Sequence, residues 1–418
     1  MKILELPTYV TIKELPEFIR RKSGYGYMTW DISKSIAKKG CQVDLLTKFN
    51  FNKGQLYCDV NFLKLTWLEI FKYSTLSLIF KALQIIYVDK LRFKKALYVI
   101  YYYISCGYLE RVIKDNKYDI VHIHGVGYFN KPIIDICEKY NLKYVTTLHG
   151  LNSFSDSKKI PNKEAGIEKE FLKNSEQNGN VVTVVSSGVR NSILSYLKIS
   201  NSNNFKVITN GSDINYYDAS EALNIRDKYS INPEQKIMLC VGRIDKNKNQ
   251  EQIIRSYKLL DSQIKKDFVI LFVGADGTEG KFLKKLDEEE LGNVKFCGYV
   301  KKDDLQDYYK QSDYNIMVSI KEGFGLPIVE GFVYGLPCVT FSDLDAVDDL
   351  YNNKTMLTIQ ERSDSSLALG ISKMFHTTWD NEFIRNYSNQ FSLEIMADKY
   401  INLFENVLEN DIKNDKYS

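Results

Sequence analysis

The chain has 418 residues, of which 44% are hydrophobic and 26% are charged, and its formal net charge is only +3. This length suits two domains of ordinary size, and the near balance of charge argues against a dedicated nucleic-acid-binding protein, which usually carries a strong basic excess. Seven scattered cysteines form no C-x-x-C pair, so they indicate buried thiols in a reducing compartment rather than disulfides or zinc ligands.

The N-terminal segment "MKILELPTYV" is a short apolar strand soon followed by charge, and it lacks the apolar region of a signal peptide. No uninterrupted apolar run reaches about eighteen residues, so no transmembrane helix is expected. These features together predict a cytoplasmic protein.

Short runs rich in β-branched residues alternate with amphipathic helical patterns along most of the chain. Most of the runs are apolar nearly throughout, as strands buried on both faces must be, and their alternation with helices predicts parallel sheets. The predicted strands are "MKILEL" (1–6), "QVDLLT" (42–47), "DIVHIH" (119–124), "KYVTTLH" (143–149), "VTVVSS" (182–187), "FKVITNG" (205–211), "KIMLCVG" (236–242), "FVILFVG" (268–274), "VKFCGYV" (294–300), "YNIMVSI" (314–320) and "PCVTF" (337–341). The clearest helical patterns are "MTWDISKSIAKKG" (28–40), "KPIIDICEKYN" (131–141) and "NQEQIIRSYKLL" (249–260).

Two such alternating series predict two doubly wound α/β domains. We expect the first over residues 1–214 and the second over residues 215–388, because a new series of strands begins after "VITNGSDINYY". Residues 389–418 contain a long amphipathic pattern with no strand after it, and we expect this helix to pack back on the first domain.

A segment from about residue 64 to residue 110 interrupts the alternation, because it is helical in character and rich in aromatic residues. Between Lys64 and Lys95 it carries seven Lys or Arg residues against Glu69 and Asp89. Two interpretations remain open. The segment is either an inserted helical pair packed on the domain, or a membrane-surface helix with aromatic and basic side chains at the lipid headgroups.

The first candidate site follows the strand "IMLCV", at the kind of strand end where open parallel sheets bind ligands. Gly242 allows a tight exit from the strand, and Arg243 and Lys248 lie in the turn before the next helix. An arginine, as a planar fork, and a lysine, as a point charge, can together hold a diphosphate. Two solvated surface cations are the alternative.

The second candidate site is "KEGFGLPIVEG" (321–331), which follows the strand "YNIMVSI". Gly323 and Gly325 let the backbone approach a ligand, and Pro327 suits the first turn of a helix whose free amides favour an anion. Glu322 before the turn and Glu330 within the helix can each accept hydrogen bonds from a vicinal diol of a sugar or ribose. Acidic stabilisation of a helix start is the alternative, and it alone accounts for Glu330.

Histidines and glycines at strand ends of the first domain form a third group. His149 ends the strand "KYVTTL", and Gly24 and Gly26 precede a helix in "RKSGYGYMTWD". The strand "DIVHIH" places His122 and His124 on one face. With four histidines in the chain and no matching cysteine, we do not expect zinc there.

In combination, "GRIDKNKN", "VKFCGYV", "SIKEGFGLPIVEG", "TLHG" and "VITNGSD" resemble the retaining glycosyltransferases of family 4, which have the GT-B fold. The order and spacing match over most of the chain, and the E-x(7)-E stretch with its preceding Gly-Arg and Lys is the specific part. The resemblance implies an α/β protein of two Rossmann-like domains facing across a cleft. It also implies transfer of a hexosyl-type sugar from a nucleotide diphosphate sugar to an acceptor hydroxyl, in bacterial surface-polysaccharide biosynthesis.

The resemblance also implies a role for each candidate residue. Glu330 would hold the ribose of the donor, and Glu322 with the following amides would hold its sugar. Arg243 and Lys248 would neutralise the diphosphate, and His149 would lie near the reacting centre. The expected catalytic residues are Arg243, Lys248, Glu322 and His149, and the expected donor-binding residues are Gly24, Gly26, Gly242, Gly323, Phe324, Gly325, Leu326 and Glu330.

The chain departs from the family pattern at three places, which bear on the identity of the donor. Residues 331–333 are Gly-Phe-Val where the family usually has Ala-Met-Ala. The loop "SDLDAVDDL" (342–350) lacks the family's Gly-Gly. Tyr25 is inserted between Gly24 and Gly26, the pair that the resemblance brings to the phosphates from the first domain.

The resemblance implies a reaction that needs no metal and no other cofactor; a D-x-D metal motif at Asp343 and Asp345 is the alternative. The expected partners are a nucleotide-sugar donor and a glycan or lipid-linked acceptor, which loops such as residues 152–166 would contact. Residues 64–95 would contact an inner membrane surface. No nucleic-acid partner is expected. There are two alternative functions. The chain could be a catalytically silent GT-B subunit that partners another glycosyltransferase, or it could be a GT-B epimerase or phosphorylase.

Overall fold

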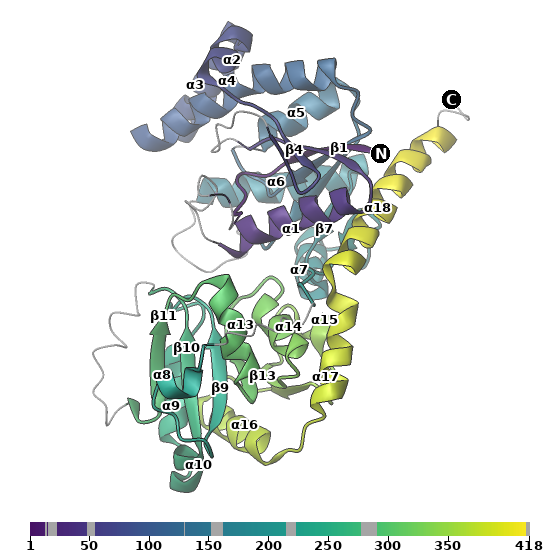
Figure 1. The fold of residues 1–418 in the computed structure, drawn as a ribbon. Coiled ribbons are helices and arrows are strands. Elements are labelled where there is room, and N and C mark those ends of the chain that lie inside the picture. Colours follow the sequence, from purple (N-terminus) through teal and green to yellow (C-terminus); the bar gives the residue numbers. More distant parts are fainter. Residues whose placement is uncertain are drawn as a thin grey trace. The chain divides into compact units, whose positions relative to one another are not determined.

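The computed structural model consists of two compact α/β units, shown in Figure 1. It describes residues 1–12, 15, 23–47, 55–128, 130–151, 162–214, 223–276 and 291–414. The first unit contains residues 1–211 and 393–418, and the second contains residues 212–392. The expected start of the second domain at residue 215, and residues 152–161 of the expected acceptor loop, lie outside the described residues.

The first unit is built on an eight-stranded sheet in the order β3-β4-β2-β1-β5-β6-β7-β8. Its strands are β1 (Lys2–Leu6), β2 (Gln42–Leu45), β3 (Gln55–Tyr57), β4 (Val60–Phe62), β5 (Ile120–His124), β6 (Tyr144–Leu148), β7 (Val182–Val184) and β8 (Phe205–Val207). All neighbours run parallel except β3 and β4, which are antiparallel. The chain winds outward in opposite directions from β1 and β5, so the topological switch point lies between these two strands.

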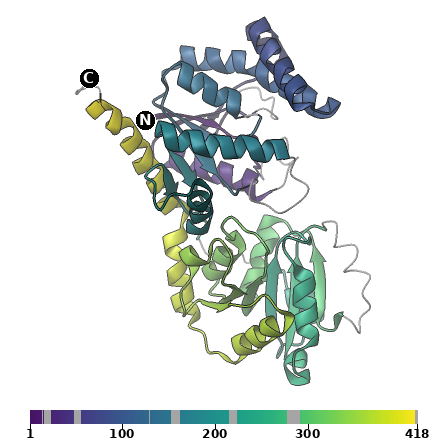
Figure 2. The same ribbon diagram turned by 180° about the vertical axis from the view of Figure 1, so that it is seen from behind.

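Helices cover both faces of this sheet, as the front and back views show (Figures 1 and 2). They are α1 (Gly24–Lys38), α2 (Trp67–Tyr73), α3 (Leu76–Asp89), α4 (Phe93–Asp115), α5 (Lys131–Lys139), α6 (Asn162–Asn178), α7 (Ser187–Leu197) and α18 (Leu393–Asn414). A capping box starts α2, in which Thr66 and Glu69 bond each other's backbone N–H. Helices α2 and α3 pack on α4 and form a projection at one end of the unit (Figure 1).

The second unit is built on a six-stranded, wholly parallel sheet in the order β11-β10-β9-β12-β13-β14. Its strands are β9 (Lys236–Val241), β10 (Phe268–Val273), β11 (Val294–Gly298), β12 (Tyr314–Met317), β13 (Cys338–Phe341) and β14 (Met356–Ile359). Alternate residues of β9 enter different apolar clusters: Met238 and Cys240 enter one, and Ile237 and Leu239 enter the other. The sheet is therefore buried on both faces, as its apolar runs predict.

The helices of the second unit complete these two layers. Within the described residues they are α8 (Ile225–Lys228), α9 (Gln250–Lys258), α10 (Ser262–Asp267), α13 (Lys302–Lys310), α14 (Leu326–Val333), α15 (Val347–Leu350), α16 (Asp364–His376), α17 (Asn381–Ser388) and the 3-10 helix η2 (Asn389–Phe391). The stripe Ile253, Ile254 and Tyr257 of α9 is buried, as its spacing predicts.

The structure confirms the predicted α/β class, the two parallel sheets, each strand predicted from the sequence, and the helical character of residues 64–110. It adds three short strands that were not predicted: β3, β4 and β14. Across the described part of the chain, no helix combines the length and the apolar character needed to cross a lipid bilayer.

Candidate active site

The residues expected to hold a diphosphate and a sugar lie on two loops of the second unit. One loop (242–249) joins β9 to α9, and the other (318–325) joins β12 to α14. Strands β9 and β12 are parallel neighbours, and the chain winds outward from them in opposite directions. Both loops therefore leave the sheet at its topological switch point, where open α/β sheets bind ligands.

Lys248 and Glu322, one from each loop, form an ion pair between the lysine Nζ and the carboxylate Oε2. The hydroxyl of Ser319 donates to the same oxygen at 3.4 Å. The lysine stem runs over Gly242, where an added Cβ would lie 3.2 Å from the lysine Cε. The structure thus joins the expected phosphate-binding cation to the expected sugar-binding carboxylate.

Arg243 lies at the surface and is bonded within its own loop. Its Nε donates to Oδ2 of Asp245 at 2.6 Å, while 70% of the arginine side chain is exposed. The other carboxylate oxygen of Asp245 accepts a hydrogen bond from the backbone N–H of Lys248 at 3.1 Å. Asp245, which the sequence analysis did not single out, therefore links the two cations.

Two further side chains that the sequence analysis did not single out hold the Glu322 loop. Asn247 bonds both backbone groups of Lys321, donating at 2.8 Å and accepting at 3.2 Å. Arg362 donates to the carbonyl of Ser319 at 2.8 Å and to the carboxylate of Asp343 at 2.6 Å. No local pattern marks these residues, since their bonds span 74 and 43 positions of the chain.

The glycine turn of the second loop leads directly into α14. Gly325 has a φ of 83°, in the left-handed region that favours glycine, and a Cβ there would lie 3.7 Å from Cγ of Glu322. The side chain of Phe324 is buried with its ring 6.2 Å from that of Phe391, so it fills the core, and its backbone is the part that can meet a ligand. The other two expected donor-binding residues of this turn are partly exposed: Gly323 and Leu326.

Glu330 lies in α14 and is oriented by a buried tyrosine. The hydroxyl of Tyr309 donates to its Oε2 at 2.8 Å, and the tyrosine ring stacks on Tyr334 with centroids 5.6 Å apart. Burial, and then the negative charge of Glu330, raise the pKa of Tyr309 well above its ordinary value, so the phenol stays protonated and keeps donating. Among the described residues, only Oε2 of Glu330 has a hydrogen-bond partner, so Oε1 can accept a further hydrogen bond.

Gly331 departs from the family's alanine for a packing reason. A Cβ at this position would lie 2.5 Å from Nδ2 of Asn315, a buried residue of β12. The same Nδ2 donates to the carbonyl of Pro327 at 2.6 Å, and this bond ties the first turn of α14 to the sheet. Asn315 therefore leaves no room for a side chain at position 331, and this accounts for the glycine.

In the first unit, His149 follows β6 and packs beside Tyr25, with ring centroids 5.1 Å apart in an edge-on arrangement. The hydroxyl of Tyr25 accepts from the backbone N–H of Thr8 at 2.9 Å and donates to the carbonyl of His124 at 3.3 Å. The tyrosine inserted between the two glycines is thus part of the surroundings of His149.

Gly24 and Gly26 lie in the first turn of α1 and differ in what surrounds them. A Cβ on Gly26 would lie 2.1 Å from Oγ1 of Thr11 and 2.9 Å from the ring of Tyr9, whereas no atom of the described residues lies within 4 Å of a Cβ on Gly24. Gly26 is therefore required by packing within its own unit, and the described residues leave room for a side chain at Gly24.

Among the described residues, one group of side chains has its possible ligand atoms close enough to surround a metal ion: Glu5, His122 and His124. All three are buried, and both oxygens of Glu5 bond to the imidazole rings, at 3.0 and 2.7 Å. These hydrogen bonds account for the group. In the alternative D-x-D motif, Asp343 bonds to Arg362, and burial raises the pKa of Asp345.

Two family models together match most of the chain: Glycosyltransferase Family 4 over residues 23–216, and Glycosyl transferases group 1 over residues 222–391. N-acetyl-alpha-D-glucosaminyl L-malate synthase of Bacillus anthracis is 22% identical over 94% of this chain and 96% of that protein. O-antigen chain mannosyltransferase B of Escherichia coli is 26% identical over 47% of this chain and 52% of that protein. Sucrose-phosphate synthase from Thermosynechococcus elongatus shares the fold with a TM-score of 0.71, at 17% identity, over 98% of this chain and all of that one.

Two parallel α/β units, with the candidate ligand loops at a switch point, define a protein of the GT-B fold. The chain belongs to glycosyltransferase family 4. It is a glycosyltransferase that uses a nucleotide sugar, and the resemblance seen in its sequence is confirmed.

Proposed function

We propose that the chain transfers a hexosyl-type sugar from a nucleoside diphosphate sugar to an acceptor hydroxyl, with retention at the anomeric carbon and without a metal ion, in the synthesis of a bacterial surface glycan. The observation that carries this proposal is the Lys248–Glu322 ion pair at the switch point of the second unit. It brings together a cation, which can neutralise a diphosphate, and a carboxylate, which can accept hydrogen bonds from sugar hydroxyls. The names of the two relatives support a hexosyl donor, and one of them also supports a surface glycan.

In this reaction the bond from the anomeric carbon to the phosphate oxygen breaks, and the acceptor oxygen bonds to the same face of that carbon. The departing diphosphate gains negative charge, which we expect Lys248, Arg243 and the first amides of α14 to stabilise. The departing phosphate oxygen takes the proton of the acceptor hydroxyl, so the proposal needs no further base. His149 keeps the role near the donor sugar that the family pattern implies.

The two carboxylates divide the rest of the donor between them in this proposal. Glu322 accepts hydrogen bonds from hydroxyls of the sugar, and Glu330 accepts them from the ribose through Oε1. Each such charge-assisted bond contributes about 1.5–3 kcal/mol. Lys248 and Arg243 supply the positive charge that a divalent cation supplies in other phosphate-transfer sites.

A donor panel tests this function. Purified protein is incubated in chelator with different nucleotide sugars and an acceptor mixture, and nucleoside diphosphate release and the anomeric configuration of the product are measured. We expect turnover with at least one donor, and a loss of roughly 10²–10³-fold in Lys248→Ala, as for other groups that stabilise transition-state charge. Lys246→Ala changes an exposed lysine of the same loop and serves as the matched control.

Each alternative predicts a different outcome of this panel. A silent subunit gives no turnover with any donor, and an epimerase or phosphorylase gives a product that contains no acceptor. A requirement for magnesium or manganese would contradict the metal-free reaction, and an inverted product would contradict retention. Full activity in Lys248→Ala would overturn the role of the ion pair.

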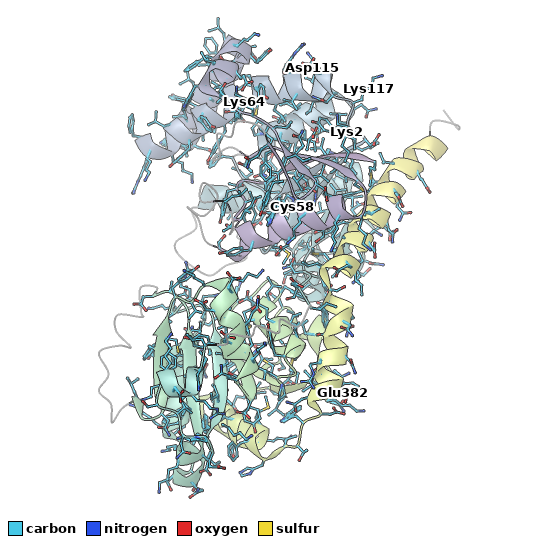
Figure 3. The ribbon with its side chains drawn as sticks, viewed as in Figure 1. Lys2, Cys58, Lys64, Asp115, Lys117 and Glu382 are labelled. Carbon is cyan, nitrogen blue, oxygen red and sulfur yellow. The ribbon has the colours of Figure 1, made fainter. Side chains whose placement is uncertain are left out.

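We also propose that α2, α3 and the start of α4 attach the enzyme to an anionic membrane surface at the inner face of the cell membrane. These helices expose many large apolar side chains, and a contiguous patch of that kind marks an interaction site. Side chains stand out along the projection in Figure 3, where Lys64 is labelled near its base. The most exposed, with 66% to 84% of their surface accessible, are Leu68, Phe71, Leu76, Phe80, Tyr87 and Phe93.

The charge of this surface supports an anionic lipid surface as its occupant. Seven basic residues against two acidic ones give a net of five positive charges, and each contributes about 1 kcal/mol beside an anionic leaflet. The basic residues are Lys64, Lys72, Lys81, Lys90, Arg92, Lys94 and Lys95. The sequence also allowed a helical pair packed on the domain. Packing of that kind involves the buried residues Ala82, Val99 and Tyr103, which form an apolar cluster, and not the exposed residues of this surface.

A further inference from the structure

A chain of buried polar side chains crosses three neighbouring strands of the first unit at its switch point. Glu5 on β1 bonds two histidines of β5: Oε1 is 3.0 Å from Nδ1 of His122, and Oε2 is 2.7 Å from Nε2 of His124. The other nitrogen of His124, Nδ1, lies 3.0 Å from Nε2 of His149 at the end of β6. The chain thus leads from the buried carboxylate to the histidine implicated in the reaction.

The carboxylate sets the direction of every bond along this chain. Burial opposes the charge of Glu5, but the charges and hydrogen bonds of His122 and His124 together outweigh it and lower the pKa of Glu5 to about 2. The ionised carboxylate is an acceptor only, so Nε2 of His124 must carry a proton. Burial, and then the charge of His122, lower the pKa of His124 to about 4. At neutral pH His124 is therefore uncharged, and its Nδ1 is a bare acceptor.

His149 has to supply the proton for the next bond. Because Nδ1 of His124 accepts, Nε2 of His149 donates. Burial, followed by the neighbouring histidines, lowers the pKa of His149 well below its ordinary value, so its ring is neutral and carries a single N–H. Its Nδ1 is therefore a bare lone pair. This atom is buried, and no described residue bonds it.

We propose that Glu5 and His124 are positioning residues that lock His149 in its Nε2–H tautomer, so that Nδ1 accepts a hydrogen bond from a hydroxyl of the glycosyl-transfer ligand. The ligand part of this inference rests on the proposed function, while the tautomer does not. A group that binds Nδ1 has to be a donor, so the relay favours a sugar hydroxyl over a phosphate or carboxylate oxygen. The Tyr25 ring packs against the imidazole in an edge-to-face arrangement, which also limits the orientation of the imidazole.

Nuclear magnetic resonance of nitrogen-labelled histidine tests the tautomer without any substrate. The chain has four histidines, and His376, exposed on α16 in the second unit, is an internal reference. We expect His124 and His149 to be protonated at Nε2 alone at neutral pH, with His149→Gln assigning the second signal. A wild-type His149 protonated at Nδ1, or at both nitrogens, would overturn the relay even if every variant failed to fold.

Glu5→Gln tests whether the carboxylate does the positioning. Glutamine has nearly the same shape but presents an N–H to one of the two rings. The tautomer of His149 should therefore become mixed. The value of kcat/KM should fall roughly ten- to a hundredfold, as for other residues that orient a site through hydrogen bonds. Thr147→Val is the matched control. Thr147 bonds the same network at Nε2 of His122, 2.7 Å away, so its loss should lower stability and leave the tautomer of His149 unchanged.

These readouts separate the inference from the proposed function. A mixed tautomer in Glu5→Gln with unchanged kcat/KM would show that His149 meets no ligand hydroxyl and would overturn the proposal. A tautomer that Glu5→Gln does not alter would overturn the positioning role. The expected wild-type tautomers in a protein without glycosyl transfer would support the relay and refute the proposed function alone.

Discussion

Glu322 and Glu330 differ in the chemistry of their partners within the second unit. Glu322 contacts the ammonium of Lys248, which offsets its charge, while Glu330 accepts a bond from the neutral hydroxyl of Tyr309. A neutral donor orients a carboxylate without cancelling its charge. We therefore expect Glu330 to accept hydrogen bonds from the hydroxyls of a ligand, and Glu322 to share its charge with the cation expected at the diphosphate.

This difference predicts different effects of removing each carboxylate. Glu330→Ala should weaken binding of a bare nucleoside diphosphate about tenfold to a hundredfold, because one charge-assisted hydrogen bond contributes about 1.5–3 kcal/mol. Glu322→Ala should mainly lower sugar transfer, since no sugar is present in the bare nucleotide. Titration calorimetry measures the first effect and turnover the second. The nucleotide affinity of Tyr309→Phe, which removes only the orienting hydroxyl, should lie between those of the wild type and Glu330→Ala. Equal losses of nucleotide affinity in the two glutamate variants would refute the different roles of Glu322 and Glu330.

The part of this site that lies in short motifs can be predicted from the sequence, and the part that depends on long-range contacts cannot. Arg243, Lys248, Glu322 and Glu330 stand in two short motifs, where spacing alone carries the pattern. The roles of Asn247 and Arg362 depend on bonds to residues far away in the chain. The glycine at position 331 similarly becomes intelligible only when Asn315 is seen beneath it. Long-range partners of this kind leave no local signature.

At the scale of single elements, α2, α3 and α4 carry the strongest prediction about location. We expect the protein to float with anionic vesicles at low salt, to come off at high salt because screening weakens the charge attraction, and not to float with neutral vesicles. Charge reversal at Arg92 and Lys94, both exposed, should abolish flotation. Flotation assays with phosphatidylserine and phosphatidylcholine vesicles measure this.

The choice of control matters for this assay. Lys95 lies over the ring of Tyr128 at 5.1 Å, so its reversal also disturbs packing and is a poor variant. Phe80→Ser tests the apolar contribution to membrane binding, because this side chain is 70% exposed. The change leaves the buried Ala82 of the same helix in place, so the packing of the helix should be kept. No flotation of the wild type under any condition would refute membrane attachment and leave a protein partner as the occupant of this surface.

The strands that the sequence did not reveal are short: β3 and β14 are edge strands, and β4 is the strand next to β3. Strands β3 and β4 have three residues each and are joined by Cys58 and Asp59, both with positive φ. Such a turn usually carries Asn-Gly or Asp-Gly, and the pair Cys-Asp gives no comparable signal. Long apolar strands such as β9 and β10 were predictable because burial on both faces fixes their composition.

At the scale of the whole molecule, the last helix belongs to the unit formed by the start of the chain. Helix α18 follows the second unit in sequence but is part of the first, where it packs on α1. Phe404 of α18 is fully buried against His122, with ring centroids 5.2 Å apart, and the hydroxyl of Tyr400 lies 3.2 Å from Oγ1 of Thr147. The C-terminal helix thus covers the polar network around Glu5.

Phe404→Ala should therefore destabilise the first unit selectively. Removing a fully buried phenylalanine costs about 3–5 kcal/mol through lost burial and the cavity left behind. Hydrogen exchange read by mass spectrometry follows the two units separately: exchange should accelerate in β5, β6 and α1, while peptides of β9, β12 and α14 and the affinity for nucleoside diphosphate stay unchanged. Asn402→Ala, at an exposed position of the same helix, is the control and should have no such effect. Unchanged exchange in β5 and β6 would show that α18 does not stabilise the first unit, and equal acceleration in both sheets would show that the two units unfold as one.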